Sequence, residues 1–274
     1  MGGPLIDRGA IVPNMTLFMD PKYQHWDMMT AMNMGLTAEK LFAQTDHTKE
    51  DMDKWALRSH QRAAAAQAEG FFDGEIMPIE AEQGDGSTMV VDTDQAVRGD
   101  STLEGLASLR PAFKKDGVIT AGISSPLNAA ATSMVLMSKE TAKKKGIKPL
   151  ATIRSIGFAG VDPTIMGHGP VPASQKALKR AGLKASDIDF WEINEAFAIV
   201  ALNCITELGL DPEIVNVMGG GIAIGHPLGA TGIRLTGTLA RILETKGGRY
   251  GCSNACVGGG QGVATIIERE DYDW

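Results

Sequence analysis

Residues 219–234 read Gly-Gly-Gly-Ile-Ala-Ile-Gly-His-Pro-Leu-Gly-Ala-Thr-Gly-Ile-Arg, and this stretch gives the first indication of a site. It places His226 in a glycine-rich turn, directly before Pro227. Glycine lets the backbone approach a ligand closely because it has no Cβ atom. Proline is favoured at the first position of a helix, where its missing N–H costs no hydrogen bond. We therefore expect a helix over 227–244, whose unpaired N-terminal N–H groups favour anions beside His226.

A second glycine cluster lies near the C-terminus, where Cys256 is followed by Val-Gly-Gly-Gly-Gln-Gly. A cysteine at a strand end can be activated by a nearby histidine or by backbone dipoles, whereas a core cysteine is inert. Histidine, cysteine and backbone N–H donors are the groups that acyl transfer needs. This hypothesis requires His226 and Cys256 to face one cleft. Without a histidine nearby, Cys256 would be a core residue.

Other kinds of site fit these residues less well. Cys252 and Cys256 are four positions apart, but no further cysteine–histidine cluster completes a four-ligand zinc site, so no metal is expected. We expect Cys252 to pack within a strand and Cys204 to pack on the apolar face of a helix. The glycines after Cys256 lie too close to the C-terminus to open a βαβ unit, and no P-loop lysine follows any glycine run.

Composition and charge limit the classes of protein further. The formal net charge of −7 gives no basic surface for nucleic acid, which is therefore not an expected partner. Three cysteines form an odd and sparse set, which argues against a disulfide scaffold and for a reducing compartment. No apolar run is long enough to span a bilayer. The first ten residues match neither a signal peptide nor a transit peptide.

The first half of the sequence mixes helical and extended patterns. Thr48 and Asp51 have the spacing of a capping box, and small or apolar residues then repeat at helical spacing up to Gly70. Two short apolar segments, 75–81 and 87–93, are bounded by Gly and Asp and predict strands of a small appended unit. We also expect a strand over 118–123, and a helix followed by a strand over 128–138.

From Pro149 onward the pattern predicts a denser alternation of strands and helices. Strands are expected at 151–159, 190–193, 249–257 and 262–268, with helices at 173–181, from 194 to 208 and at 227–244. Such an alternation is typical of layered α/β proteins.

Three of these segments together resemble the C-terminal motifs of the thiolase family: Asn194-Glu-Ala-Phe-Ala198, Gly225-His-Pro-Leu-Gly229 and Cys256-Val-Gly-Gly-Gly-Gln-Gly262. Supporting matches begin at Met34, Leu109, Thr120 and Val161. The resemblance implies an α/β fold of two similar halves in five αβαβα layers, with a loop domain inserted in the first half. It places the loop domain and the adjoining part of the N-terminal half at 1–112, the end of that half at 113–148, and the C-terminal half at 149–274.

The resemblance also implies a role for each motif residue. His226 would deprotonate a nucleophilic cysteine, and Cys256 would exchange a proton with the departing or attacking acetyl group. Asn194 would hold a water that forms one oxyanion hole with His226, and the backbone N–H of Gly258 would belong to a second. Coenzyme A would be a substrate, and no cofactor is implied. Its pantetheine and acyl portions would contact Met34, Phe113, Ser125, Met166, Ala196 and Phe197.

The sequence departs from the family pattern at three places. Family members carry the nucleophilic cysteine in the first half, in a motif resembling Cys-Gly-Ser-Gly, whereas here no cysteine precedes Cys204. We therefore expect the sequence to begin inside the loop-domain region, so that the first half is incomplete. Ala129-Ala130 stands where the family has Asp-Gly, which removes a polar anchor. Asn33 replaces a histidine found in some acetoacetyl-specific members, which favours the degradative branch.

The expected function is that of a thiolase-type acyltransferase, which cleaves 3-ketoacyl-CoA with CoA into acetyl-CoA and a shortened acyl-CoA in fatty acid β-oxidation. One alternative is an acetyl-CoA C-acetyltransferase specific for acetoacetyl-CoA. Another is an inactive CoA-binding fragment, because the nucleophilic cysteine is absent from this chain. The resemblance implies a homodimer or homotetramer for a full-length protein and leaves open a partner subunit of β-oxidation. The expected location is the cytoplasm, with an organelle as the alternative.

Overall fold

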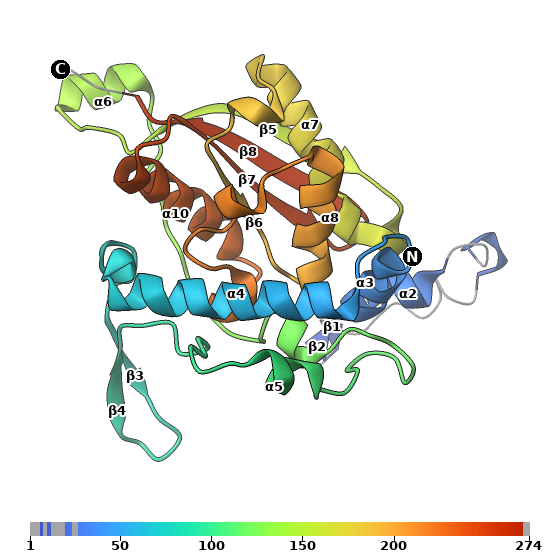
Figure 1. Ribbon diagram of the computed structural model, residues 1–274. Helices are drawn as coiled ribbons and strands as arrows, with labels where there is room; N and C mark the ends of the chain where they lie inside the picture. Colours follow the sequence, from blue (N-terminus) through green and yellow to red (C-terminus); the bar gives the residue numbers. More distant parts are fainter. Residues whose placement is uncertain (1–5, 8–9, 12–19, 24–26, 271–274) are drawn as a thin grey trace.

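The computed structural model describes residues 6–7, 10–11, 20–23 and 27–270, and its centre is a four-stranded sheet (Figure 1). The strands β5 (Thr152–Gly160), β6 (Phe190–Ile193), β7 (Tyr250–Val257) and β8 (Gln261–Glu268) lie in the order β5-β8-β7-β6. β6 and β7 are parallel, with Ile193 opposite Asn254, and the other neighbours are antiparallel. The predicted α/β pattern of this region is confirmed, with strand ends shifted by one residue at most.

Helices cover both faces of this sheet. α7 (Pro170–Ala181) packs so closely on one face that a Cβ at Gly157 would lie 2.1 Å from a backbone oxygen of the helix. α10 (Thr231–Lys246) packs on the other face, where a Cβ at Gly251 would lie 2.8 Å from the side chain of Leu239. α8 (Ala198–Leu208) lies on the α7 side. The resulting helix–sheet–helix sandwich is the layered arrangement that the sequence predicts.

α4 (Lys49–Ala68) is a long helix that covers α8 and crosses the body of the molecule (Figure 1). Thr48 caps its N-terminus, and the Thr48 and Asp51 side chains form the predicted capping box. Its buried face includes the small and apolar positions expected from the periodicity: Met52, Trp55, Ala56, Ser59 and Ala63. Beyond its C-terminal end, the predicted strands form a hairpin of β3 (Ile79–Glu82) and β4 (Thr88–Val91) that projects from the body (Figure 1).

Short elements complete the described part of the chain. The α-helices are α2 (Met28–Met32), α3 (Met34–Phe42), α5 (Leu103–Ala107), α6 (Lys139–Lys145) and α9 (Gly221–Ile224). The 3₁₀ helices are η1 (Pro21–Tyr23), η2 (Phe71–Gly74), η3 (Ala121–Ile123), η4 (Pro163–His168), η5 (Ala185–Asp187) and η6 (Pro212–Ile214). A two-residue pair of strands, β1 (Ile6–Asp7) and β2 (Ala10–Ile11), lies near the N-terminus.

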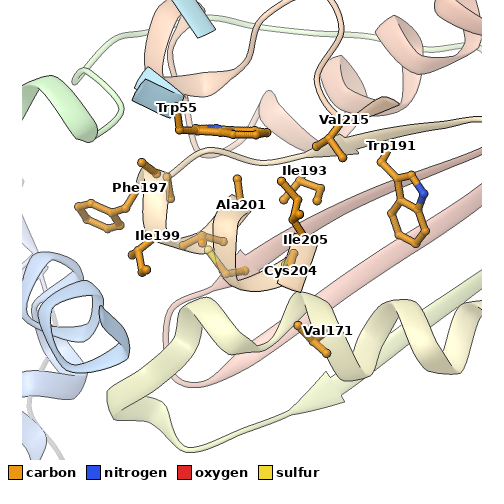
Figure 2. Packing of buried hydrophobic residues seen from close by; sticks show 14 of the residues in the cluster. Trp55, Val171, Trp191, Ile193, Phe197, Ile199, Ala201, Cys204, Ile205 and Val215 are labelled. Atoms are coloured by element: carbon orange, nitrogen blue, oxygen red, sulfur yellow. The ribbon is translucent and has the colours of Figure 1, made fainter. Parts of the chain in front are cut away.

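The main hydrophobic core surrounds α8. In Figure 2, Trp55 of α4 and Val171 of α7 lie on opposite sides of α8, whose Ala201, Cys204 and Ile205 point into the cluster. Cys204 and Cys252 are both fully buried, as predicted for packing residues. Residues of α4 and of the sheet therefore share one continuous core.

Three predictions of secondary structure are wrong. The helix expected from Pro227 begins at Thr231 instead, so a turn separates His226 from α10. The segment 128–138 forms neither a helix nor a strand and is exposed throughout. The stretch expected as a strand over 118–123 holds one isolated bridge at Thr120 and the short helix η3. Within the described residues the other two sheets have two strands each, so a second large layer is not formed there.

Candidate active site

The predicted site segment that begins at Asn194 follows β6 directly. The Asn194 backbone N–H donates to the carbonyl oxygen of Asn254 on β7 over 2.9 Å, which extends the parallel pairing by one residue. Cys256 lies two residues further along β7. The carboxyl ends of parallel strands meet at one edge of a sheet, where ligands bind in many α/β proteins. β6 and β7 thus bring the Asn194 and Cys256 segments to the same edge.

The Asn194 side chain is buried and unpaired. Its exposed fraction is 0%, and neither its Oδ1 nor its Nδ2 atom has a hydrogen-bond partner in the structure. Buried amide groups are nearly always hydrogen-bonded to protein or to ordered water. An unpaired, buried amide at the carboxyl edge of the sheet can therefore hold a water or a ligand oxygen, as the sequence predicts for Asn194.

His226 follows α9, in a turn fixed by the side chain of Asn128. The Asn128 Oδ1 atom accepts from the His226 backbone N–H over 3.2 Å, and its Nδ2 atom donates to the Ile224 carbonyl over 3.3 Å. Gly225 between them has a φ of +102°, and a Cβ there would lie 2.0 Å from the Asn128 amide. Glycine is required at this position because a side chain would be both strained and in collision.

The Thr231 hydroxyl contacts both His226 and Pro227. It lies 2.7 Å from His226 Nδ1 and 2.9 Å from the Pro227 carbonyl oxygen, which also accepts from the backbone N–H groups of Ala230 and Thr231. With the hydroxyl donating to Pro227, the Nδ1–H of His226 donates to Thr231 and Nε2 carries the lone pair. Nε2 makes no hydrogen bond within the described part of the chain. Burial lowers the pKa of His226, and the charge of Arg234 lowers it further, which keeps the ring neutral and able to take a proton.

Cys256, unlike His226, holds a proton that it can donate. It is 7% exposed and belongs to the main hydrophobic core, and burial raises the pKa of its thiol to about 12. At neutral pH the group is therefore a protonated thiol, which can donate a proton but is not a nucleophile. No hydrogen bond joins Cys256 to His226, and the convergence of these two side chains on one cleft stays a prediction.

Four of the predicted substrate-contacting residues lie together in front of α8. The rings of Phe113 and Phe197 meet edge to face, with centroids 5.8 Å apart. The Ser125 backbone N–H donates to the carbonyl of Ala196 over 3.0 Å, and Ser124 forms a bridge with Phe197. These contacts bring residues 113, 125, 196 and 197 together, and their contact with a substrate stays a prediction.

Met34 and Gly258 lie next to this group of residues. A Cβ at Gly258 would lie 3.4 Å from the Met34 sulfur, and a Cβ at the neighbouring Gly35 would overlap the Phe113 ring. Met166 differs, because it is 2% exposed and packs in the main core. The structure therefore places Met34 close to both Gly258 and Phe113, whereas Met166 is buried in the main core.

A buried ion pair lies beneath α10, on the face of the sheet opposite α7. Glu192 of β6 is fully buried, and its Oε2 atom lies 3.2 Å from Nη1 of Arg234. Burial raises the pKa of Glu192 to about 8, although the charge of Arg234 opposes the shift. Arg234 therefore contributes to the electrostatics of both Glu192 and His226.

Sequence reasoning missed two side chains that build the site. Asn128 was not assigned a role, and Glu195 was quoted only as part of a motif. The available signal for Glu195 was a carboxylate within the apolar run that surrounds β6, because buried charges need dedicated partners. Two hollows lie elsewhere: one is lined by Arg249, Glu268, Arg269 and Glu270, the other by Lys49, Glu50, Asp53, Leu103, Glu104 and Ala107. None of the helices in the described part of the chain is both long and apolar enough to cross a membrane.

The fold and these side chains define an α/β protein with an unpaired amide and a protonated thiol on segments that meet at one sheet edge, and with a neutral histidine in the turn before α10. Residues 14–140 match the family model "Thiolase, N-terminal domain", and residues 147–269 match "Thiolase, C-terminal domain". The chain belongs to the thiolase family.

Relatives and solved structures agree with this assignment. The chain is 48% identical over 254 residues to a 3-ketoacyl-CoA thiolase of Marinobacter nauticus and 47% identical to that of Hahella chejuensis, with 91% of this chain covered in both. It spans 65% of the length of each of these curated relatives. Bacillus anthracis acetyl-CoA acetyltransferase superposes with a TM-score of 0.82 at 48% identity, covering 86% of this chain and 60% of that one. Human mitochondrial 3-ketoacyl-CoA thiolase in complex with CoA superposes with a TM-score of 0.80 at 42% identity, covering 89% and 61%.

Proposed function

We propose that this chain carries the acyl-CoA-binding and proton-transfer part of a thiolase-type acyltransferase. The reaction is the cleavage of 3-ketoacyl-CoA by CoA into acetyl-CoA and an acyl-CoA shortened by two carbons. The observation that carries the proposal is the buried, unpaired amide of Asn194, which lies in a motif of this family beside the turn that leads to His226. The names of the bacterial relatives support the degradative direction.

The chemistry assigns each group a step. A thiolate attacks the 3-keto carbon, and the bond between C2 and C3 breaks with its electron pair left on C2 as an enolate. The protonated thiol of Cys256 gives its proton to C2, which releases acetyl-CoA. CoA then gives its thiol proton to the Cys256 thiolate and attacks the acyl thioester, which releases the shortened acyl-CoA and the nucleophilic thiolate. His226 takes the proton of the nucleophilic thiol when that thiolate first forms. Asn194 and the N–H of Gly258 would stabilise the oxyanions.

The nucleophilic thiolate is not supplied by the cysteines of this chain. Cys204, Cys252 and Cys256 are all buried, and burial raises the pKa of each thiol. A thiolysis assay with 3-ketoacyl-CoA and CoA should therefore show no acetyl-CoA above background for residues 1–274, while calorimetry should detect CoA binding. Thiolysis at an ordinary enzymatic rate would disprove the argument about the nucleophile.

A partial reaction tests the proposed site without that nucleophile. Removal of a methyl proton from acetyl-CoA is the reverse of the step assigned to Cys256, so deuterium should enter the methyl group in D₂O. Because the thiol pKa is about 12, the exchange rate should rise roughly tenfold per pH unit between neutral and mildly alkaline pH. The measurement is mass spectrometry of recovered acetyl-CoA.

Three variants control this exchange, two of them at cysteines of β7 and one at Asn194. Cys256→Ala should reduce the exchange to the solvent rate, and Asn194→Ala should slow it strongly. Cys252→Ala removes a neighbouring buried thiol and should leave the exchange intact. Equal rates for Cys256→Ala and the unchanged chain would contradict the proposal.

A specific acetoacetyl-CoA thiolase is the second candidate, favoured by the similarity to the acetyl-CoA acetyltransferase of Bacillus anthracis. A series of 3-ketoacyl-CoA ligands of increasing chain length distinguishes the two. We expect binding across the series, and binding confined to the four-carbon ligand would favour the second candidate. We further propose a homo-oligomer and a cytoplasmic location, which light scattering and fractionation would test.

A further inference from the structure

Glu195 is a buried carboxylate with an unusual set of partners. Its exposed fraction is 0%, and none of the ion pairs formed within the described residues includes it. Four neutral donors surround it instead. Oε1 accepts from Trp55 Nε1 over 2.9 Å and from Asn216 Nδ2 over 2.7 Å, and Oε2 accepts from Ser59 Oγ over 2.6 Å and from the Ile222 backbone N–H over 3.2 Å. A carboxylate, which only accepts, matches this set of donors.

The four donors come from three separate parts of the fold. Trp55 and Ser59 lie on α4, Asn216 follows η6, and Ile222 lies in α9, four residues before His226. Asn216 is held in a left-handed conformation with a φ of +47°, and its amide also makes two hydrogen bonds to the backbone of Ile193. The carboxylate therefore ties the turn that leads to the histidine onto α4.

The glycines of this turn are packed directly onto the carboxylate. A Cβ at Gly220 would lie 2.4 Å from the Glu195 carboxyl carbon, and the Gly220 N–H donates to Ser59 Oγ over 3.0 Å. A Cβ at Gly221 would lie 3.3 Å from Oδ1 of Asn194. The turn thus lies against both Glu195 and the unpaired amide beside it.

We propose that Glu195 is a positioning residue, which holds the Gly220–Ile222 turn and hence His226 at a fixed distance from Asn194. Its importance for acyl transfer rests on the proposed function, whereas the structural coupling does not. Groups that act together on one oxyanion must be held within a fraction of an ångström, and their own partners supply that precision.

Glu195→Gln tests the proposal, because the amide has one acceptor oxygen in place of two. Its NH₂ group cannot face the Trp55 and Asn216 donors, so it must face Ser59 and Ile222. The Ser59 hydroxyl can rotate to accept, but the Ile222 N–H cannot and loses its partner. Hydrogen–deuterium exchange should therefore become at least tenfold faster at Ile222 and through the turn to His226, and the ring resonance of His226 should shift.

Ile205→Val is the matched control, since it removes a methylene from the core on α8, remote from this turn. It should lower global stability without a selective change at Ile222 or at the His226 ring. If Glu195→Gln does not fold, Ser59→Ala tests the same link, because its hydroxyl joins Oε2 to the Gly220 N–H. Trp55→Phe removes a donor that does not reach the turn, and it should leave the His226 resonance in place.

Unchanged exchange at Ile222 in both Glu195→Gln and Ser59→Ala would overturn the proposal. These readouts use no acyl-CoA, so they can succeed even if the proposed function fails. Deuterium exchange of acetyl-CoA in the same variants tests the functional part. A slower exchange with unchanged CoA affinity supports a positioning role, whereas an unchanged exchange rate would limit Glu195 to a structural role.

Discussion

At the scale of single residues, the surroundings of His226 and Cys256 determine which of the two side chains carries a proton that it can donate. Burial and the charge of Arg234 lower the pKa of His226, so its ring stays neutral, and Cys256 keeps its proton because it lies in the core. The type and order of these residues could be predicted from the sequence. The protonation states could not, because they depend on burial and on partners such as Thr231 and Arg234.

The three thiols should be unreactive in the folded chain. All three are buried, and burial raises their pKa, so the fraction of thiolate at pH 8 is very small. A colorimetric thiol titration should detect none rapidly in buffer and three per chain after unfolding in guanidinium. Rapid reaction of one equivalent, traced to Cys256 by peptide mapping, would contradict its buried placement.

Glu192 should make stability depend on pH. Its folded pKa of about 8 is raised above its unfolded value of 4.5, so its contribution is fully present below pH 4.5 and is lost as pH rises towards 8. Glu192→Gln removes this titration and should flatten the urea midpoint between pH 5 and 8. Glu268→Gln is a control at a second buried carboxylate, and an equal slope in Glu192→Gln and the unchanged chain would disprove the assignment.

At the scale of elements, the periodicity of the sequence correctly predicted the helices and strands whose pattern comes from packing one face against the core. α4 and its capping box, the hairpin and all four strands of the central sheet follow local signals. Those signals failed where the backbone depends on distant contacts. α10 begins at Thr231 because the Pro227 carbonyl is used by a turn, and the apolar segment 128–138 has no strand beside it within the described residues.

The packing of α7 on the sheet should tolerate no side chain at Gly157. A Cβ there would lie 2.1 Å from the Ala173 carbonyl oxygen, so Gly157→Ala must push the helix away and should cost about 3 kcal/mol of unfolding free energy. Gly160→Ala in the same strand is the control, because a Cβ at Gly160 meets no atom within 4 Å. Equal urea midpoints for the two variants would show that α7 packs less closely.

At the scale of the whole molecule, we predict that the exposed segment 128–138 promotes self-association. Val135 and Leu136 are 84% and 67% exposed, and the sequence from Ala129 to Ser138 carries no charge. Exposed, uncharged, extended segments pair readily with other chains. Leu136→Lys should therefore reduce light scattering at high concentration without lowering the thermal midpoint, whereas Gln61→Lys, an equal charge on the exposed face of α4, should have no such effect.

One carboxylate joins the regions that match the two thiolase family models. Trp55 and Ser59 lie in the first region, Glu195 in the second, and separating them would leave the carboxylate with two of its four donors. Each lost hydrogen bond to a charged group costs about 1.5–3 kcal/mol. The two regions should consequently unfold in a single thermal transition. Peptides 1–146 and 147–274 should each be disordered when separate, and their native circular dichroism spectrum should return only when they are mixed.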